Sequence, residues 1–132
     1  MIFETVDCLA FFDHRPLFPG HCLVIPRTHY ETLADLPAPL AATLFEHARR
    51  LTALMETALG AEGAFVAINN RVSQSVPHVH VHVVPRRKGD GLKGFFWPRR
   101  KYRDPTEMEQ VRSAVRLAVD GIRKSTMRDP AV

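Results

Sequence analysis

The order of apolar and polar residues divides the chain into short strands, a long helix, two further strands and a second helix. Thr5–Val6, Cys8–Phe12 and Cys22–Ile25 are apolar or aromatic, and turns that contain glycine and proline separate them. These features are typical of β-strands, so we expect three strands in the first part of the chain. The apolar segments Ala64–Ile68 and His78–Val84 predict two more.

Two segments have the period of an amphipathic helix. In Leu40–Leu59 the apolar residues recur every three or four positions, with Pro37 and Pro39 near the start and Gly60 after the end. The same period predicts a second helix over about Thr106–Ile122. Strands with helices inserted between them predict an α+β domain with a mainly antiparallel sheet.

The length and composition fit a small globular protein. A chain of 132 residues is long enough for one core, so we expect a single domain over residues 1–125 and a frayed tail over residues 126–132. The sequence has neither the pattern of a signal peptide nor an apolar run of roughly 18 residues, which predicts a cytoplasmic protein that does not enter a membrane. A net charge of +4 is compatible with a phosphate-bearing partner.

Residues 78–84 carry the strongest chemical pattern. Histidine and valine alternate, which predicts a strand with valines on its buried face and imidazoles about 6.6 Å apart on the other. A single histidine in this position is usually structural, whereas three in register indicate function. Two interpretations stay open: a metal site, or nucleophilic and acid–base chemistry at phosphorus. The three histidines are His78, His80 and His82.

The context of this run resembles the histidine triad (HIT) family of nucleotide hydrolases and transferases. The family pattern, histidine alternating with apolar residues and ending in two of them, matches residues 78–84 at every position. Further blocks of the family lie on both sides of the run. They are Phe11–Asp13, Pro19–His21, Leu23–Pro26, His29, Gln74–Val76 and Pro85–Arg86.

The resemblance implies a role for each histidine of the triad. His80 matches the nucleophile, which attacks the α-phosphorus of a nucleotide and forms a nucleotidyl-histidine that water then hydrolyses. His82 is expected to bind phosphate oxygens, and His78 is expected to orient His80. Gln74 matches a residue that contacts the phosphate or the leaving group, so we count it with the catalytic residues.

The resemblance also implies a set of substrate-binding residues. Asp13 matches a ribose-binding residue and His29 one that borders the phosphate site, whereas His21 stays between a structural and a functional interpretation. The other expected positions are Asn69 (with Asn70 as its possible substitute), Ser75 and Val76, the last two through backbone N–H groups. The expected substrate is a purine nucleotide, such as a dinucleoside polyphosphate or a nucleoside phosphoramidate.

The chain differs from the family pattern in the loop before the triad. Many family members have a glycine in a slightly longer loop, whereas residues 69–74 contain none, and Arg71 becomes a possible phosphate contact. The chain also lacks the Cys-x-x-Cys pair of zinc-containing relatives, so we expect no metal and no cofactor. Its two cysteines, Cys8 and Cys22, are expected to be free and buried.

The resemblance implies a five-stranded sheet with two helices and a homodimer. Residues 86–103 are basic and contain aromatic residues, a mixture that serves nucleic-acid binding as well as substrate or dimer contacts. We favour substrate or dimer contacts over nucleic acid. A metal-independent hydrolase is the leading hypothesis, and the alternatives are a non-catalytic nucleotide-binding module and a metal-binding protein that uses the face of His78, His80 and His82.

Overall fold

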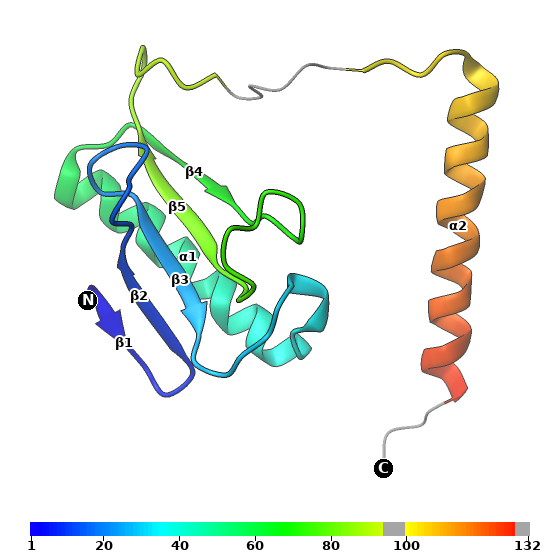
Figure 1. Cartoon of the computed structure of the whole chain (residues 1–132), viewed down its shortest axis with the longest axis horizontal. Coiled ribbons are helices and arrows are strands. Elements are labelled where there is room, and N and C mark those ends of the chain that lie inside the picture. Colours follow the sequence, from blue (N-terminus) through cyan, green and yellow to red (C-terminus); the bar gives the residue numbers. More distant parts are fainter. Residues whose placement is uncertain (94–99, 129–132) are drawn as a thin grey trace. The chain divides into compact units, whose positions relative to one another are not determined.

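Residues 3–86 contain a five-stranded antiparallel sheet. The computed structural model describes residues 1–93 and 100–128. The strands lie in the order β1-β2-β3-β5-β4 (Figure 1). This architecture confirms the predicted α+β fold with two helices. The elements are β1 (Phe3–Glu4), β2 (Cys8–Phe12), β3 (Cys22–Pro26), a 3₁₀ turn (Leu33–Asp35), α1 (Ala38–Leu59), β4 (Gly63–Ala67), β5 (Val81–Arg86) and α2 (Pro105–Arg128).

Helix α1 covers one face of the sheet and makes the core with it (Figure 1). Its Leu44 and Leu51 are at most 4% exposed and pack with Val24 of β3 and with Val81 and Val83 of β5. Both helix ends follow the sequence signals, since a proline lies in the first turn and Gly60 at the C-cap takes a left-handed φ of 61°. Within residues 1–91, α1 packs on one face of the sheet only, and the opposite face carries His82.

Three predicted strands begin at different residues in the structure. Strand β4 is Gly63–Ala67, one residue earlier than predicted. The first strand is Phe3–Glu4 rather than Thr5–Val6, because Thr5 closes a turn: its Oγ1 accepts a 3.0 Å hydrogen bond from the N–H of Cys8. Strand β5 begins at Val81, so His78 and His80 precede it. The prediction of one strand over residues 78–84 was therefore wrong for its first three residues, although Val79 and Val81 are both fully buried as the alternation requires.

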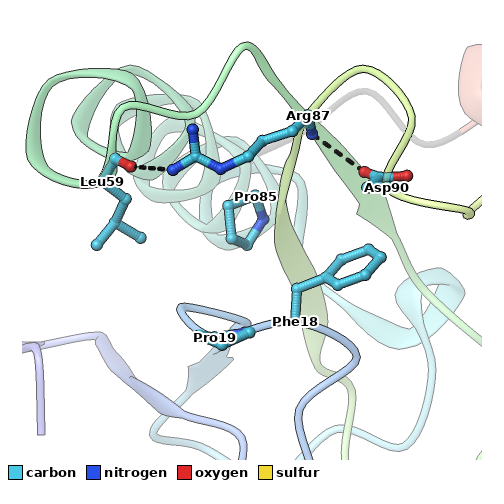
Figure 2. A pocket seen from close by; sticks show the side chains of 6 residues that line it. All are labelled: Phe18, Pro19, Leu59, Pro85, Arg87 and Asp90. Atoms are coloured by element: carbon cyan, nitrogen blue, oxygen red, sulfur yellow. Dashed lines mark hydrogen bonds between the residues drawn. The ribbon is translucent and has the colours of Figure 1, made fainter.

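Hydrogen bonds from Arg87, the residue after β5, join this strand to the C-terminal end of α1, beside a pocket of about 330 Å³ (Figure 2). The Arg87 guanidinium donates hydrogen bonds to the carbonyls of Gly60, at 2.5 Å, and Leu59. These bonds satisfy carbonyls that a helix end leaves unpaired. Gly20 packs against this corner with φ +97°, and a Cβ there would lie 2.5 Å from Cδ1 of Leu59. The positive φ favours glycine at position 20, since a residue with a Cβ would be strained there.

Both cysteines are free and buried, as predicted. Burial raises the pKa of Cys8, and it raises the pKa of Cys22 to about 11. Neither thiol is therefore ionised near neutral pH, and both serve as small core side chains.

The chain divides into two compact units, Met1–Gly91 and Leu92–Val132. In the second unit α2 continues to Arg128, so residues 126–128 of the expected tail are helical, and residues 129–132 lie outside the described residues. The expectation of one domain over residues 1–125 stays a prediction. Residues 94–99 of the basic and aromatic stretch also lie outside the described residues. Neither described helix has the length and apolar character needed to cross a membrane.

Candidate active site

The face of the sheet opposite α1 forms the floor of a cavity of about 510 Å³. Strand register places Phe11 of β2 opposite Leu23 of β3, and Leu23 opposite His82 of β5. Successive side chains on a strand point to opposite faces, and the neighbours Cys22 and Val83 belong to the core. The row of Phe11, Leu23 and His82 therefore faces the cavity.

Polar groups from three segments complete the lining of the cavity. Six of the nine predicted site residues lie there, namely Asp13, Ser75, Val76, His78, His80 and His82. Five further lining residues were not among the predicted site residues: Phe11, His14, Arg15, Leu23 and Ile25. His14 and Arg15 directly follow Asp13, which was the available signal for them.

His80 presents one ring nitrogen as an unprotonated lone pair. Its Nδ1 lies 2.7 Å from the carbonyl oxygen of His78. A carbonyl only accepts hydrogen bonds, so Nδ1 must carry the proton and Nε2 of the neutral ring keeps its lone pair. The residue is 8% exposed. The backbone thus fixes the ring of His80 with the lone pair on Nε2, the form of imidazole that can act as a nucleophile.

His82 has the opposite tautomer, which the buried His21 sets. The backbone N–H of Leu17 donates to Nδ1 of His21 at 3.2 Å, so the proton of the neutral His21 ring lies on Nε2. This Nε2 lies 3.0 Å from Nδ1 of His82 and donates to it. His82 must then carry its own proton on Nε2. The sequence left His21 undecided, because its partner lies 61 residues away in the chain.

The electrostatics keep these two imidazoles neutral. Burial lowers the pKa of His82 to about 4, with the neighbouring His80 and His21 rings adding to the effect. Burial also lowers the pKa of His21. A hydrogen bond from the N–H of Arg15, at 2.8 Å, lowers the pKa of Asp13. At neutral pH the site therefore holds an anionic carboxylate beside neutral imidazole donors and acceptors.

His78 uses both of its ring nitrogens for support. Nε2 donates to the carbonyl of Pro26 at 2.9 Å, which leaves Nδ1 as an acceptor. The Nδ1 of His29 lies 3.1 Å from that atom and is its donor. His29 therefore contacts the triad through His78 and lies outside the described cavity lining. The rings of His80 and His82 stand edge to face with centroids 4.9 Å apart.

Gln74 holds the loop that precedes the triad. Its Oε1 accepts a hydrogen bond from the N–H of Arg71, and its Nε2 donates to the carbonyl of Glu31, both at 2.7 Å. Arg71 and Ser73 have φ of 65° and 60°, the left-handed conformation that favours glycine. The glycine-free loop thus adopts glycine-like geometry, which positions Ser75 at the cavity.

The remaining predicted positions lie farther from the cavity in the described structure. Asn69 and Gln74 are not among the described lining residues, and neither is Asn70, whose Oδ1 instead accepts the N–H of Leu33 at 2.8 Å. Among the described residues, the group of three whose ligating atoms gather within 4.8 Å is Asp13, His21 and His82. The metal interpretation of the sequence had invoked the three triad histidines instead.

The fold and this site define a class of protein: an α+β domain with a histidine-lined cavity on the open face of an antiparallel sheet. Residues 1–89 match the model of the HIT domain, and the chain belongs to this family. A solved protein of Streptococcus mutans UA159, SMU.412c, has the same fold with a TM-score of 0.78 and 30% identity. The match covers 89% of this chain and 75% of that one.

Two curated relatives have named activities. The bis(5'-nucleosyl)-tetraphosphatase [asymmetrical] of Schizosaccharomyces pombe is 36% identical over 68% of this chain and 50% of its own length. The adenylylsulfatase HINT3 of Arabidopsis thaliana is 31% identical over 69% of this chain and 47% of its own length. This chain thus matches about half the length of these two relatives.

Proposed function

We propose that the chain is a metal-independent nucleotide hydrolase that cleaves at a substituted α-phosphate through a nucleotidyl-His80 intermediate. The observation that carries this proposal is the pairing of opposite tautomers in one cavity. Nε2 of His80 is a lone pair because Nδ1 bonds the His78 carbonyl, and Nε2 of His82 is a donor because Nδ1 accepts from His21. A nucleophile and a phosphate-oxygen donor thus line the same space.

The reaction divides into two displacements. In the first, the lone pair of His80 Nε2 forms a bond to the α-phosphorus, and the bond to the leaving group breaks with its electron pair leaving on that group. In the second, water attacks the same phosphorus, the N–P bond breaks, and its electron pair returns to Nε2. The attacking water releases a proton to solvent. His82 donates to a nonbridging oxygen in both steps.

The cavity also has groups suited to the rest of a nucleotide. The Asp13 carboxylate accepts one backbone hydrogen bond and keeps further lone pairs, which suits it to the two ribose hydroxyls. Phe11, Leu23 and Ile25 provide an apolar wall for a purine base. Backbone N–H groups at Ser75 and Val76 would serve the phosphate.

Three predicted residues are assigned supporting roles. Gln74 holds the phosphate-side loop, and His29 orients His78. Asn69 is proposed at the rim, where the substrate would meet it. The activities for which the two relatives are named, a tetraphosphatase and an adenylylsulfatase, support a nucleotide substrate with an acidic leaving group.

The test is the replacement of the proposed nucleophile. His80→Ala should lower kcat on diadenosine tetraphosphate by about a thousandfold or more, since the proposed covalent intermediate forms on the His80 ring. His47→Gln is the matched control and should keep activity, because His47 packs against Phe3 on the α1 side of the molecule. Retained turnover in His80→Ala contradicts the assignment. Nucleotide binding without turnover by the unmodified chain would instead support the binding-module alternative.

A further inference from the structure

The polar residues that line the cavity lie on two sides of an apolar floor. On one side are the lining residues within 75–82, which lead into β5, and on the other are residues 13–15, which follow the end of β2. Strand β3 lies between β2 and β5 and contributes Leu23 and Ile25 to the floor. The proposed nucleophile, His80, belongs to the first side, so the phosphate binds there and residues 13–15 are left for the nucleoside half.

The backbone of Arg15 is fixed beside the carboxylate that is proposed to bind ribose. Its N–H donates a 2.8 Å hydrogen bond to Oδ1 of Asp13, which closes a short turn. Pro16 follows, and a proline restricts the residue before it to an extended backbone. Both constraints act before any ligand arrives, so the Arg15 side chain starts from a defined point at the nucleoside end of the cavity.

The guanidinium of Arg15 is available to a ligand. Arg15 lines the cavity, and among the residues that the structure describes no hydrogen bond or ion pair engages its guanidinium. Other arginines of the same compact unit are held by the protein: Arg27 bonds Glu4 at 2.6 Å, and Arg86 bonds Asp90 at 2.5 Å. The cavity thus contains a cationic group with several free N–H donors and no structural task.

A guanidinium discriminates between the two purine bases. It offers only donors, arranged in a planar fork that fits two neighbouring acceptors. Guanine has two such acceptors on one edge, N7 and O6, whereas adenine has N7 beside an amino group, which is itself a donor. The apolar side chains of Phe11, Leu23 and Ile25 can pack against the plane of either base, so they do not distinguish them.

We propose that Arg15 binds the N7 and O6 edge of the base, and that the site therefore prefers guanine nucleotides to adenine nucleotides. The inference rests on the proposed function and names the base of the same substrate. It concerns the nucleotidyl half that His80 would carry, so it is independent of the group that is expelled.

Substrates with one leaving group and different bases test the proposal. The 5′-p-nitrophenyl esters of GMP, IMP and AMP share the phosphate, the ribose and the leaving group. IMP has the N7 and O6 atoms of GMP without its amino group, so we expect kcat/KM for both to exceed the AMP value by about tenfold. The 7-deaza-GMP ester, which lacks N7, should fall towards the AMP value. Calorimetric titration with GMP and AMP should give the same order of Kd without turnover.

Variants of Arg15 separate recognition of the base from a general effect of charge. Arg15→Lys keeps the charge but loses the fork, so the GMP-to-AMP ratio should fall to about twofold or less, as in Arg15→Ala. Arg49→Ala is the matched control and should keep the ratio, because Arg49 is exposed on α1, which packs on the other face of the sheet. Circular dichroism and thermal unfolding confirm that each variant is folded.

The outcomes separate this inference from the proposed function. Equal kcat/KM for the GMP and AMP esters, or a preference for AMP, would overturn the base preference while the hydrolase stands. Turnover of no ester, nor of diadenosine tetraphosphate, would overturn the proposed function, and the ratio of the two Kd values then decides the base preference.

Two further results would contradict the role of Arg15. In a folded Arg15→Ala, an equal loss of activity on all esters would mean that the guanidinium acts on the phosphate and not on the base. A preference that persists in Arg15→Ala and disappears in His14→Gln would assign base recognition to His14, which lies on the same turn, 3.8 Å from Asp13.

Discussion

Three histidines that are equivalent in the sequence become chemically different residues in the structure. Each ring receives its tautomer from a different fixed partner: the Pro26 carbonyl for His78, the His78 carbonyl for His80, and the His21 ring for His82. Carbonyls and backbone amides cannot change roles, so the assignment follows from the fold itself. The difference between the Nε2 lone pair of His80 and the Nε2 donor of His82 is therefore a property of the backbone around the triad.

The lowered pKa of His82 predicts a dependence of stability on pH. The folded state holds the pKa near 4, and an unfolded histidine has one near 6.5. Between these values the unfolded chain binds more protons, so the free energy of unfolding must fall as the pH falls from 6.5 to 4. One such group contributes a slope of at most about 1.4 kcal/mol per pH unit.

Urea unfolding between pH 4 and pH 7.5 measures this slope. His82→Gln should have a flatter profile than the unmodified chain, and an NMR titration should show the His82 ring charging near pH 4. An NMR titration midpoint of His82 close to pH 6.5 would contradict the lowered pKa and the burial that causes it. The His47→Gln control should leave the slope unchanged.

The sequence predicted many of the residues that line the site. The residues that it did not predict depend on contacts between distant parts of the chain. Spacing and resemblance identified His80, His82 and Asp13, and all three line the cavity. The role of His21 could not be predicted, because it depends on a contact with His82 across two strands. Gln74 was expected at the substrate, whereas its described hydrogen bonds hold the loop.

At the scale of elements, the loop between β4 and β5 carries backbone strain in place of glycine. Ser73 has φ 60°, a conformation that costs a residue with a Cβ about 1–2 kcal/mol. Glycine relieves this strain but loses more entropy on folding. We therefore expect Ser73→Gly to raise the free energy of unfolding by about 0.5–1 kcal/mol.

Thermal and urea unfolding test this expectation. Ser73→Val should change stability in the opposite direction, because a β-branched side chain is poorly accommodated at positive φ. If Ser73→Gly is destabilising, the left-handed geometry of the loop is incorrect. The pair of variants leaves the cavity-lining side chains in place, so activity serves as a control for the position of Ser75.

The predicted elements were right in kind and wrong at several ends. Strand and helix periods located both helices and four of the five strands, because each of these elements has one apolar face in its sequence. The residues at which the strands begin depend on individual hydrogen bonds, which the spacing of apolar residues does not reveal. Thr5 turns the chain before β2, and the Val79 N–H donates to the Tyr30 carbonyl at 2.7 Å before β5 begins.

At the scale of the whole molecule, the HIT-domain match and the first compact unit cover nearly the same residues, 1–89 and Met1–Gly91. The cavity and all nine predicted site residues lie within this part. The sequence predicted its fold because the motif blocks are spread across the sheet. The sequence contains no motif that marks the boundary between the two compact units near Gly91. The apolar spacing of α2 predicts a helix but does not indicate the unit to which the helix belongs.

The homodimer expected from the family stays a prediction at this scale. Sedimentation equilibrium of the full chain over a hundredfold range of concentration should give twice the mass of the 132-residue chain. A mass that stays at one chain throughout that range would contradict the expectation. The hydrolytic mechanism uses groups of one chain, so the two results leave the proposed chemistry unchanged.

The most direct test of the central claim is detection of the nucleotidyl-His80 intermediate. The protein is mixed with diadenosine tetraphosphate, denatured within milliseconds at alkaline pH, and digested for mass spectrometry. We expect up to one AMP group per chain, on the peptide that contains His80 and on its imidazole, and no adduct in His80→Ala. Turnover without an adduct, or an adduct on another residue, would contradict this expectation.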